Sequence, residues 1–213
     1  ALNGSVIAAW ISRLPATRDR LDADPRTIGL TLLTLQAYSL ALQDPKESGI
    51  VVNLQPGSYT AVVSGTNQTT GVGLVEVYDT NQVANSQLAN ISTRGFVDTG
   101  ENVMIGGFIV GPDTGLAPRI LIRAIGPSLS AVGINNALMD PTLELHDGSG
   151  TLIQSNDDWR DSQEADVLAT SIQPTDNREA AIVVNAGPGA YTAIVKGKGT
   201  ATGVALVEAY NLQ

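Results

Sequence analysis

Short apolar segments recur along this chain at the spacing typical of β-strands. Between residues 88 and 213 they alternate with turn sequences such as GPDTG and HDGSG. The segments that read as strands are LANISTRGFV, NVMIGGFIVG, PRILIRAIG, TLELH, TLIQS, IVVN, YTAIV and GVALVEAY. Roughly eight short strands with regular turns predict an antiparallel β-sandwich of jelly-roll or immunoglobulin-like topology.

The last part of this pattern occurs twice, as an internal repeat. Residues 44–79 align with residues 176–211 at an offset of 132 without a gap, and 20 of the 36 pairs are identical. In each copy, the segment IVVN leads to a Pro-Gly pair, YTA(V/I)V returns, and a last strand follows, which predicts a hairpin plus one strand. The chain is therefore expected to be mainly β, with two tandem antiparallel sandwich modules.

The two predicted modules are unequal. No part of residues 1–43 resembles residues 88–146. The first module (1–80) therefore contains only the second half of the repeat, whereas the second module (88–213) is complete. Residues 81–87 are polar and are interpreted as a linker.

Each module is expected to carry one short helix. In the first, Asp24 and the proline after it predict a start for a helix near 25–37. In the second, Asp161 and Glu164 have the spacing of a capping box. The apolar stripe of this second helix is expected to consist of Ala165, Leu168, Ala169 and Ile172.

Charge and composition exclude several classes of function. The net charge is −9, so the surface should repel nucleic acid and anionic membranes. No apolar run reaches the roughly 18 residues of a membrane-spanning helix. The absence of cysteine excludes disulfides and thiolate metal sites. Partners are therefore not expected to include nucleic acid, and no membrane span is predicted.

Residues 88–213, and 44–79 with them, resemble a known family. The segments LANISTRGFV, RILIRAIGPSL, DPTLELHDGSGTLIQSNDDW and PGAYTAIVKG are similar to a β-sandwich repeat of large secreted or surface-anchored bacterial proteins. The second half also resembles prepeptidase-type C-terminal (PPC-like) modules. The resemblance implies an extracellular or cell-surface location and a non-catalytic accessory role.

The sequence offers little for catalysis, and we expect no enzyme. His146 is the only histidine, and Ser128 in GPSLS is the serine that it could serve. That serine lacks the second glycine and the strand-turn-helix context of a nucleophile elbow. A solvated position at the end of a strand is the more economical interpretation of His146.

A candidate metal site lies in the sequence SNDDWRD. Asn156, Asp157, Asp158 and Asp161 could together offer oxygen ligands to Ca²⁺. The alternative is that these residues form turns and cap the following helix. No full EF-hand spacing is present, which weakens the calcium interpretation. Ca²⁺ is the only cofactor that the sequence suggests.

Two repeated acids point to a structural ion pair. Glu76 and Glu208 occupy equivalent positions inside otherwise apolar strands. A glutamate there either faces solvent or meets an arginine, because an unpaired buried charge is very costly. The candidate partners are Arg94, Arg119 and Arg123, which all lie in the half that the first module lacks.

The missing half suggests a function. A small sheet with an open edge recruits other strands, and contacts between copies that do not close produce fibres. Residues 1–43 or the second module could cover the exposed face within one chain, or another copy could supply the missing surface. The first hypothesis takes the last of these: a structural subunit of an extracellular filament that polymerises with itself by completing its first module. The alternative is an adhesion module that binds glycan or matrix, with or without calcium. The residues expected at the assembly joint are Leu30, Leu32, Leu33, Leu35, Val6 and Ile7.

Overall fold

The computed structural model describes residues 7–14, 42, 44–79, 89–111 and 117–212. The predicted helix near 25–37 and the linker at 81–87 lie outside these residues. So do five of the six residues expected at the assembly joint, which are Val6, Leu30, Leu32, Leu33 and Leu35. The sixth, Ile7, is the first residue of a strand.

The described part of the chain is mainly β, as predicted. The strands are β1 (Ile7–Leu14), β2 (Gly71–Val77), β3 (Asn90–Val97), β4 (Met104–Val110), β5 (Arg119–Ile125), β6 (Pro141–Asp147), β7 (Leu152–Asn156), β8 (Ala180–Asn185), β9 (Gly189–Gly197) and β10 (Gly203–Asn211). The helical elements are two short 3₁₀ segments, η1 (Thr66–Gln68) and η2 (Pro127–Val132), and one short helix, α2 (Glu164–Ala169). Eight of the strands lie after residue 88, so the predicted number of strands there is confirmed.

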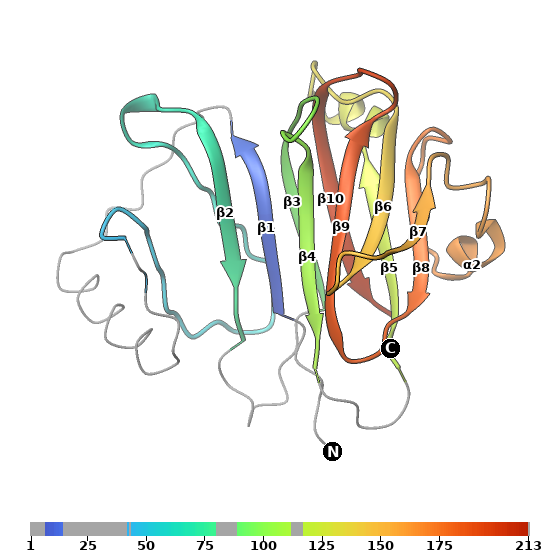
Figure 1. Ribbon diagram of the computed structural model, residues 1–213, viewed down its shortest axis with the longest axis horizontal. Helices are drawn as coiled ribbons and strands as arrows, with labels where there is room; N and C mark the ends of the chain where they lie inside the picture. The colour runs from blue at the N-terminus through green and yellow to red at the C-terminus, as the bar shows by residue number, and fades with distance from the viewer. Residues whose placement is uncertain (1–6, 15–41, 43, 80–88, 112–116, 213) are drawn as a thin grey trace. The chain divides into compact units, whose positions relative to one another are not determined.

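Two antiparallel sheets face each other in a sandwich-like arrangement (Figure 1). One sheet has the order β7-β6-β9-β4, and the other has the order β3-β10-β5-β8. Strand β1 connects the two at one side, because it pairs along β4 and also joins β3 through Arg13 and Phe96. Strand β2 pairs with β1 on the other edge of that strand.

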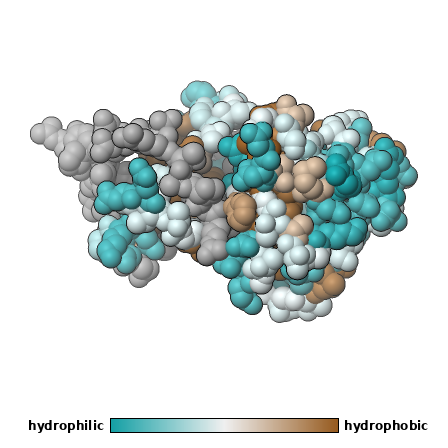
Figure 2. Space-filling view, turned by 90° about the horizontal axis from the view of Figure 1, so that it is seen from above, coloured by the Kyte–Doolittle hydropathy of each residue, from teal (hydrophilic) through white to brown (hydrophobic). Residues whose placement is uncertain are grey.

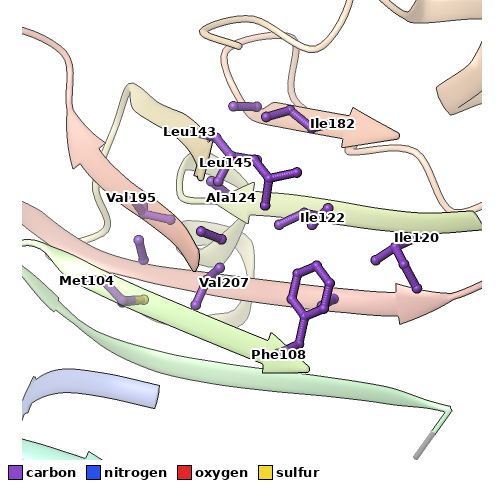
Figure 3. Packing of buried hydrophobic residues seen from close by; sticks show 14 of the residues in the cluster. Met104, Phe108, Ile120, Ile122, Ala124, Leu143, Leu145, Ile182, Val195 and Val207 are labelled. Carbon is purple, nitrogen blue, oxygen red and sulfur yellow. The ribbon is translucent and has the colours of Figure 1, made fainter. Parts of the chain in front are cut away.

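The core lies between the two sheets, where the alternation of side chains along each strand places one face inward. On β4, Met104 and Phe108 are buried, and the ring of Phe108 points toward Ile120 and Ile122 of β5 (Figure 3). The ring of Phe108 also stacks on Tyr191 of β9, with 5.2 Å between the ring centroids. Aliphatic residues fill most of this core, as the low aromatic content of the sequence requires.

The helix of the second module begins later than its capping sequence predicts. It starts at Glu164, and Asp161 does not cap it. Gln163 stands at the N-cap and uses its side chain elsewhere: its amide nitrogen donates to the carbonyl oxygen of Val183 at 2.7 Å, and its amide oxygen accepts from the Val183 N–H at 2.9 Å. A tertiary contact with β8 therefore replaces the local cap.

The apolar stripe predicted for this helix was also wrong. Leu168 is 44% exposed, whereas Val167 is fully buried. Val167 packs with Trp159 and Leu121 over the outer face of the sheet that contains β5, and Ile172 joins this cluster from beyond the end of the helix. The helix is six residues long, and Val167 is its buried residue.

The predicted hairpin is wrong in the second copy of the repeat. β8 and β9, which follow one another around the Pro-Gly turn, do not pair with each other. β8 pairs with β5 in one sheet, and β9 pairs with β4 and β6 in the other. The turn therefore crosses from one sheet to the other, which sequence periodicity cannot distinguish from a hairpin.

The first copy of the repeat has a different structure over most of its length. Residues 44–64 contain no strand, although their equivalents form β8 and β9. The last strand is kept as β2, and it pairs with β1 as β10 pairs with β3: Glu76 lies opposite Ala9, and Glu208 lies opposite Ser92. Both pairs are antiparallel.

The chain separates into two compact units. One unit comprises Ala1–Ala16 and Gly65–Gln213, and the other comprises Thr17–Ser64. Strands β1 and β2 thus belong to the same unit as the eight strands of the sandwich.

Among the described residues, no helix is long and apolar enough to cross a membrane. Hydrophilic residues make up much of the coloured surface on the face in Figure 2, with apolar residues between them.

The repeat offers a matched pair of positions for testing the core. Ile182 is fully buried, whereas its equivalent Ile50 is 68% exposed. We expect Ile182→Ala to lower the free energy of unfolding by about 2–5 kcal/mol, because a cavity remains. Ile50→Ala should change it by less than about 0.5 kcal/mol. Urea unfolding followed by circular dichroism measures both, and equal losses would contradict the assigned burial.

Candidate functional site

Among the described residues, the most deeply buried ion pair joins β5 to β10, with side chains 15% (Arg123) and 8% (Glu208) exposed. The guanidinium of Arg123 bonds to the carboxylate of Glu208, with its Nε donating to Oε2 at 2.9 Å. Tyr210 completes the group, because its hydroxyl donates to Glu208 Oε1 at 2.9 Å and accepts from Arg123 Nη2 at 3.0 Å. We call Arg123, Glu208 and Tyr210 the ion-pair site.

The strand register brings these three residues together. Glu208 lies directly opposite Arg123 in the β5–β10 pair, and Tyr210 lies two residues along on the same face. The Arg123 guanidinium also lies over the Tyr210 ring, 5.0 Å from its centroid. Burial raises the pKa of Tyr210, and the negative charge of Glu208 adds to that rise. The tyrosine therefore acts as a neutral hydrogen-bond donor in the site.

The other two arginines that the sequence offered lie elsewhere. Arg119 bonds to Asp166 of α2 at 2.7 Å, and this pair is largely exposed. Arg94 is exposed and lies opposite Leu206 in the β3–β10 register. Of the three candidates, Arg123 is the one that meets Glu208.

The equivalent acid in the first copy has kept one of these contacts. The Tyr78 hydroxyl donates to Glu76 Oε1 at 3.0 Å, as Tyr210 does to Glu208. Burial raises the pKa of Tyr78, and the bond to Glu76 adds to the rise. Within the described parts of the chain, no lysine or arginine forms an ion pair with Glu76. The acid and the tyrosine are therefore arranged alike in both copies, but the described residues supply an arginine partner only to the second.

Sequence reasoning missed a second buried carboxylate, that of Glu179. Its side chain is fully buried. Oε1 accepts the N–H groups of Gly126 and Ser128 at 3.1 and 3.0 Å and the Ser128 hydroxyl as well. This carboxylate ties the start of η2 to the turn before β8. The signal in the sequence was the repeated acid itself, since Glu47 occupies the equivalent position.

Glycine is required at the turn that Glu179 holds. A Cβ at Gly126 would lie 2.0 Å from the carbonyl oxygen of Leu138, which is backbone and cannot move aside. In the sequence GPS, the glycine therefore permits close packing against Leu138, and the backbone N–H groups of Gly126 and Ser128 bind the carboxylate of Glu179. The Ser128 hydroxyl donates to that same carboxylate, and the turn leads into a 3₁₀ segment and not into the α-helix of a nucleophile elbow.

His146 takes no part in a catalytic group with Ser128. One ring nitrogen lies 3.1 Å from the carbonyl oxygen of Gly150, and the other lies 3.2 Å from Glu144 Oε2. Glu144 also accepts from the Lys196 ammonium at 2.9 Å, and this bond lowers the pKa of Glu144 despite partial burial. The histidine belongs to the charged network at the end of β6.

The predicted metal site is only partly assembled. Asp157 and Asp158, which follow β7, come together with Asp140, which precedes β6. One oxygen atom from each lies within 4.8 Å of the others, and we call these three residues the acidic cluster. Asp140 was not predicted, because it lies far away in sequence and arrives through the pairing of β6 with β7.

The other two predicted ligands are not available at the cluster. The Asn156 oxygen accepts the N–H of Ala181 at 2.8 Å, and its amide nitrogen donates to the backbone of Asp158. Asp161 is not one of the grouped acids. Lys198 supplies a positive charge instead, with its ammonium 2.6 Å from Asp157. Ca²⁺ takes six to eight oxygen ligands, so these residues fit a lysine-neutralised cluster better than a finished calcium site.

The acidic cluster nevertheless keeps unused oxygen atoms. One carboxylate oxygen on each of Asp140, Asp157 and Asp158 is buried and has no hydrogen-bond partner among the described residues. Desolvation raises the pKa of Asp158, and repulsion from Asp157 adds to it. The cluster is therefore a group of mutually repelling carboxylates that a bound cation or water would stabilise.

Comparisons with known proteins add no assignment. A scan against models of protein families found no match, and a search of the curated proteins found none either.

The ion-pair site should carry a measurable share of the stability. Arg123→Met leaves the carboxylate of Glu208 buried without its cation, so we expect a loss of about 3–5 kcal/mol in the free energy of unfolding. Arg119→Met, on the same strand, breaks only an exposed pair and should cost no more than about 1 kcal/mol. Chemical denaturation measures both variants. Similar losses would show that the Glu208 pair has no special weight.

The acidic cluster should respond to pH through Asp158. The pKa of this carboxyl is raised in the folded state, so its ionisation above the ordinary value of 3.8 destabilises the fold. Asp158→Asn should therefore raise the melting temperature at neutral pH in the presence of chelator. The gain should disappear below that pKa, where the wild-type carboxyl is protonated in both states. Thermal melts from pH 3 to pH 7 check this, with the exposed Glu101→Gln as control.

Proposed function

We propose that this chain is a non-catalytic structural subunit of an extracellular or cell-surface assembly. In this proposal, the first 80 residues are an incomplete sandwich module, and neighbouring copies supply the strands that it lacks. The alternation and turn pattern, the internal repeat and the family resemblance support two tandem modules of jelly-roll or immunoglobulin-like type.

The observation that carries the proposal is the contrast in burial between the two copies of the repeat. Many residues that are buried in the second copy have exposed equivalents in the first, although several of the side chains are identical. The large apolar residues exposed in the first copy are Ile50, Val51, Val52, Leu54, Tyr59, Val62, Val63, Val72 and Leu74. Exposed apolar residues in this number are typical of a segment that binds a partner.

The partners of the second copy indicate what would cover these residues. β8 is covered by pairing with β5, and β9 by pairing with β4 and β6. All three partner strands lie between residues 88 and 147, the part for which the first copy has no counterpart. Strand addition would supply the missing backbone hydrogen bonds together with apolar burial.

Self-assembly gives the direct test. We expect the purified chain to sediment as oligomers whose size grows with concentration, and negative-stain microscopy should show extended particles. Val52→Lys in the exposed copy should shift the population toward monomer, because it places a charge in the interface. Leu168→Lys is the matched control, since Leu168 is also exposed but lies on α2 of the second module.

A calcium-dependent adhesion module that binds glycan or matrix is the second candidate. The buried carboxylate oxygens of the acidic cluster that lack hydrogen-bond partners favour it. A chain that stays monomeric at high concentration, and whose melting temperature rises on addition of Ca²⁺, would replace the first proposal with this one.

A further inference from the structure

The edge of β2 that faces away from β1 differs in occupancy from the equivalent strand β10. β2 pairs with β1, whereas β10 pairs with β3 on one edge and with β5 on the other. The backbone N–H and C=O groups along the outer edge of β2 are therefore those that a further antiparallel strand would use. Among the described residues, β1 is the only strand that pairs with β2.

The side chains on this edge show the same relationship. Val204 of β10 is 9% exposed, whereas its equivalent Val72 is 64% exposed. Glu208 is buried against Arg123, whereas Glu76 is exposed and, among the described residues, accepts a hydrogen bond from Tyr78 alone. The β2 strand thus carries an acid and a tyrosine that are bonded to each other as in the ion-pair site. Among the described residues, no neighbouring strand supplies an arginine to them.

We propose that the outer edge of β2 binds an antiparallel, apolar strand that places an arginine opposite Glu76. The β5–β10 pair within the same chain specifies this occupant: Arg123 lies opposite Glu208, and Ile125 lies opposite Leu206. At the offset of 132, the bound strand places its arginine at Glu76 and an aliphatic residue at Leu74. This deepens the proposed function by defining the chemistry of the strand that completes the first module.

Electrostatics and packing act together in this docking. The arginine fork can bond Glu76 and Tyr78 at once, as Arg123 bonds Glu208 and Tyr210. Aliphatic neighbours of the arginine cover Val72 and Leu74, which are otherwise exposed. A lysine is a poorer substitute, because its ammonium lacks the planar fork.

A peptide with the sequence of residues 118–126, PRILIRAIG, is the probe. We expect a fluorescent form to bind the full chain saturably in a polarisation assay. Replacing the arginine that corresponds to Arg123 by glutamine should weaken binding about tenfold or more, since a charge-assisted pair is lost. Glu76→Gln in the protein should weaken binding of the original peptide to a similar degree, whereas Glu101→Gln should not.

Charge reversal separates the specific pair from general attraction to an acidic protein. The variant Glu76→Arg should bind the peptide with Arg123→Glu better than it binds the original peptide. Hydrogen exchange of the full chain should show added protection over Gly71–Val77 when the original peptide is bound. Equal binding of the arginine and glutamine peptides, no effect of Glu76→Gln, or no binding at all would overturn the inference.

The outcomes distinguish this inference from the proposed function. Oligomers that form although the peptide neither binds nor competes would reject the arginine strand and leave self-assembly standing. A monomeric chain that binds the peptide through Glu76 would reject self-assembly and retain the docking edge. Because Glu76 is exposed, its variants should fold, and circular dichroism checks that they do.

Discussion

The structure depends on one constraint: the strands of the repeated segment must pair with strands from outside the repeat. β8 needs β5, β9 needs β4 and β6, and β10 needs β3 and β5. Burial follows from these pairings, because each strand turns one face toward the opposite sheet. Where the partners are present, the repeat forms part of a core. Where they are absent, as in the first copy, the repeated sequence leaves apolar residues exposed to solvent.

The buried acids show how this constraint reaches the polar groups. Glu208 and Glu179 are carboxylates that would be costly to bury alone. Arg123 and Tyr210 satisfy the first, and backbone N–H groups from the turn after β5 satisfy the second. Both sets of partners come largely from the β5 region. This strand supplies a positive charge to Glu208, and the turn after it supplies hydrogen-bond donors to Glu179.

Much of the strand pattern could be predicted, but its connections could not. Alternation and turn residues located all eight strands after residue 88, and the isolated glutamate in an apolar strand indicated an arginine partner. The hairpin failed because periodicity does not tell whether a Pro-Gly turn reverses within a sheet or crosses between sheets. The helix cap failed because Gln163 bonds to β8 instead. Asp140 was missed because strand pairing alone brings it to Asp157 and Asp158.

The sequence by itself determined the contacts that span a few residues, and these recur in both copies. A tyrosine hydroxyl bonds the carbonyl four residues before it, another bonds a glutamate two residues before it, and a glutamate accepts the N–H of an aspartate three residues before it. The paired donors and acceptors are Tyr59 to Gln55 and Tyr191 to Gly187, Tyr78 to Glu76 and Tyr210 to Glu208, and Asp44 to Glu47 and Asp176 to Glu179. Only the tertiary structure decided which copy forms strands in a core, because pairing and burial depend on residues tens of positions away that just one copy possesses.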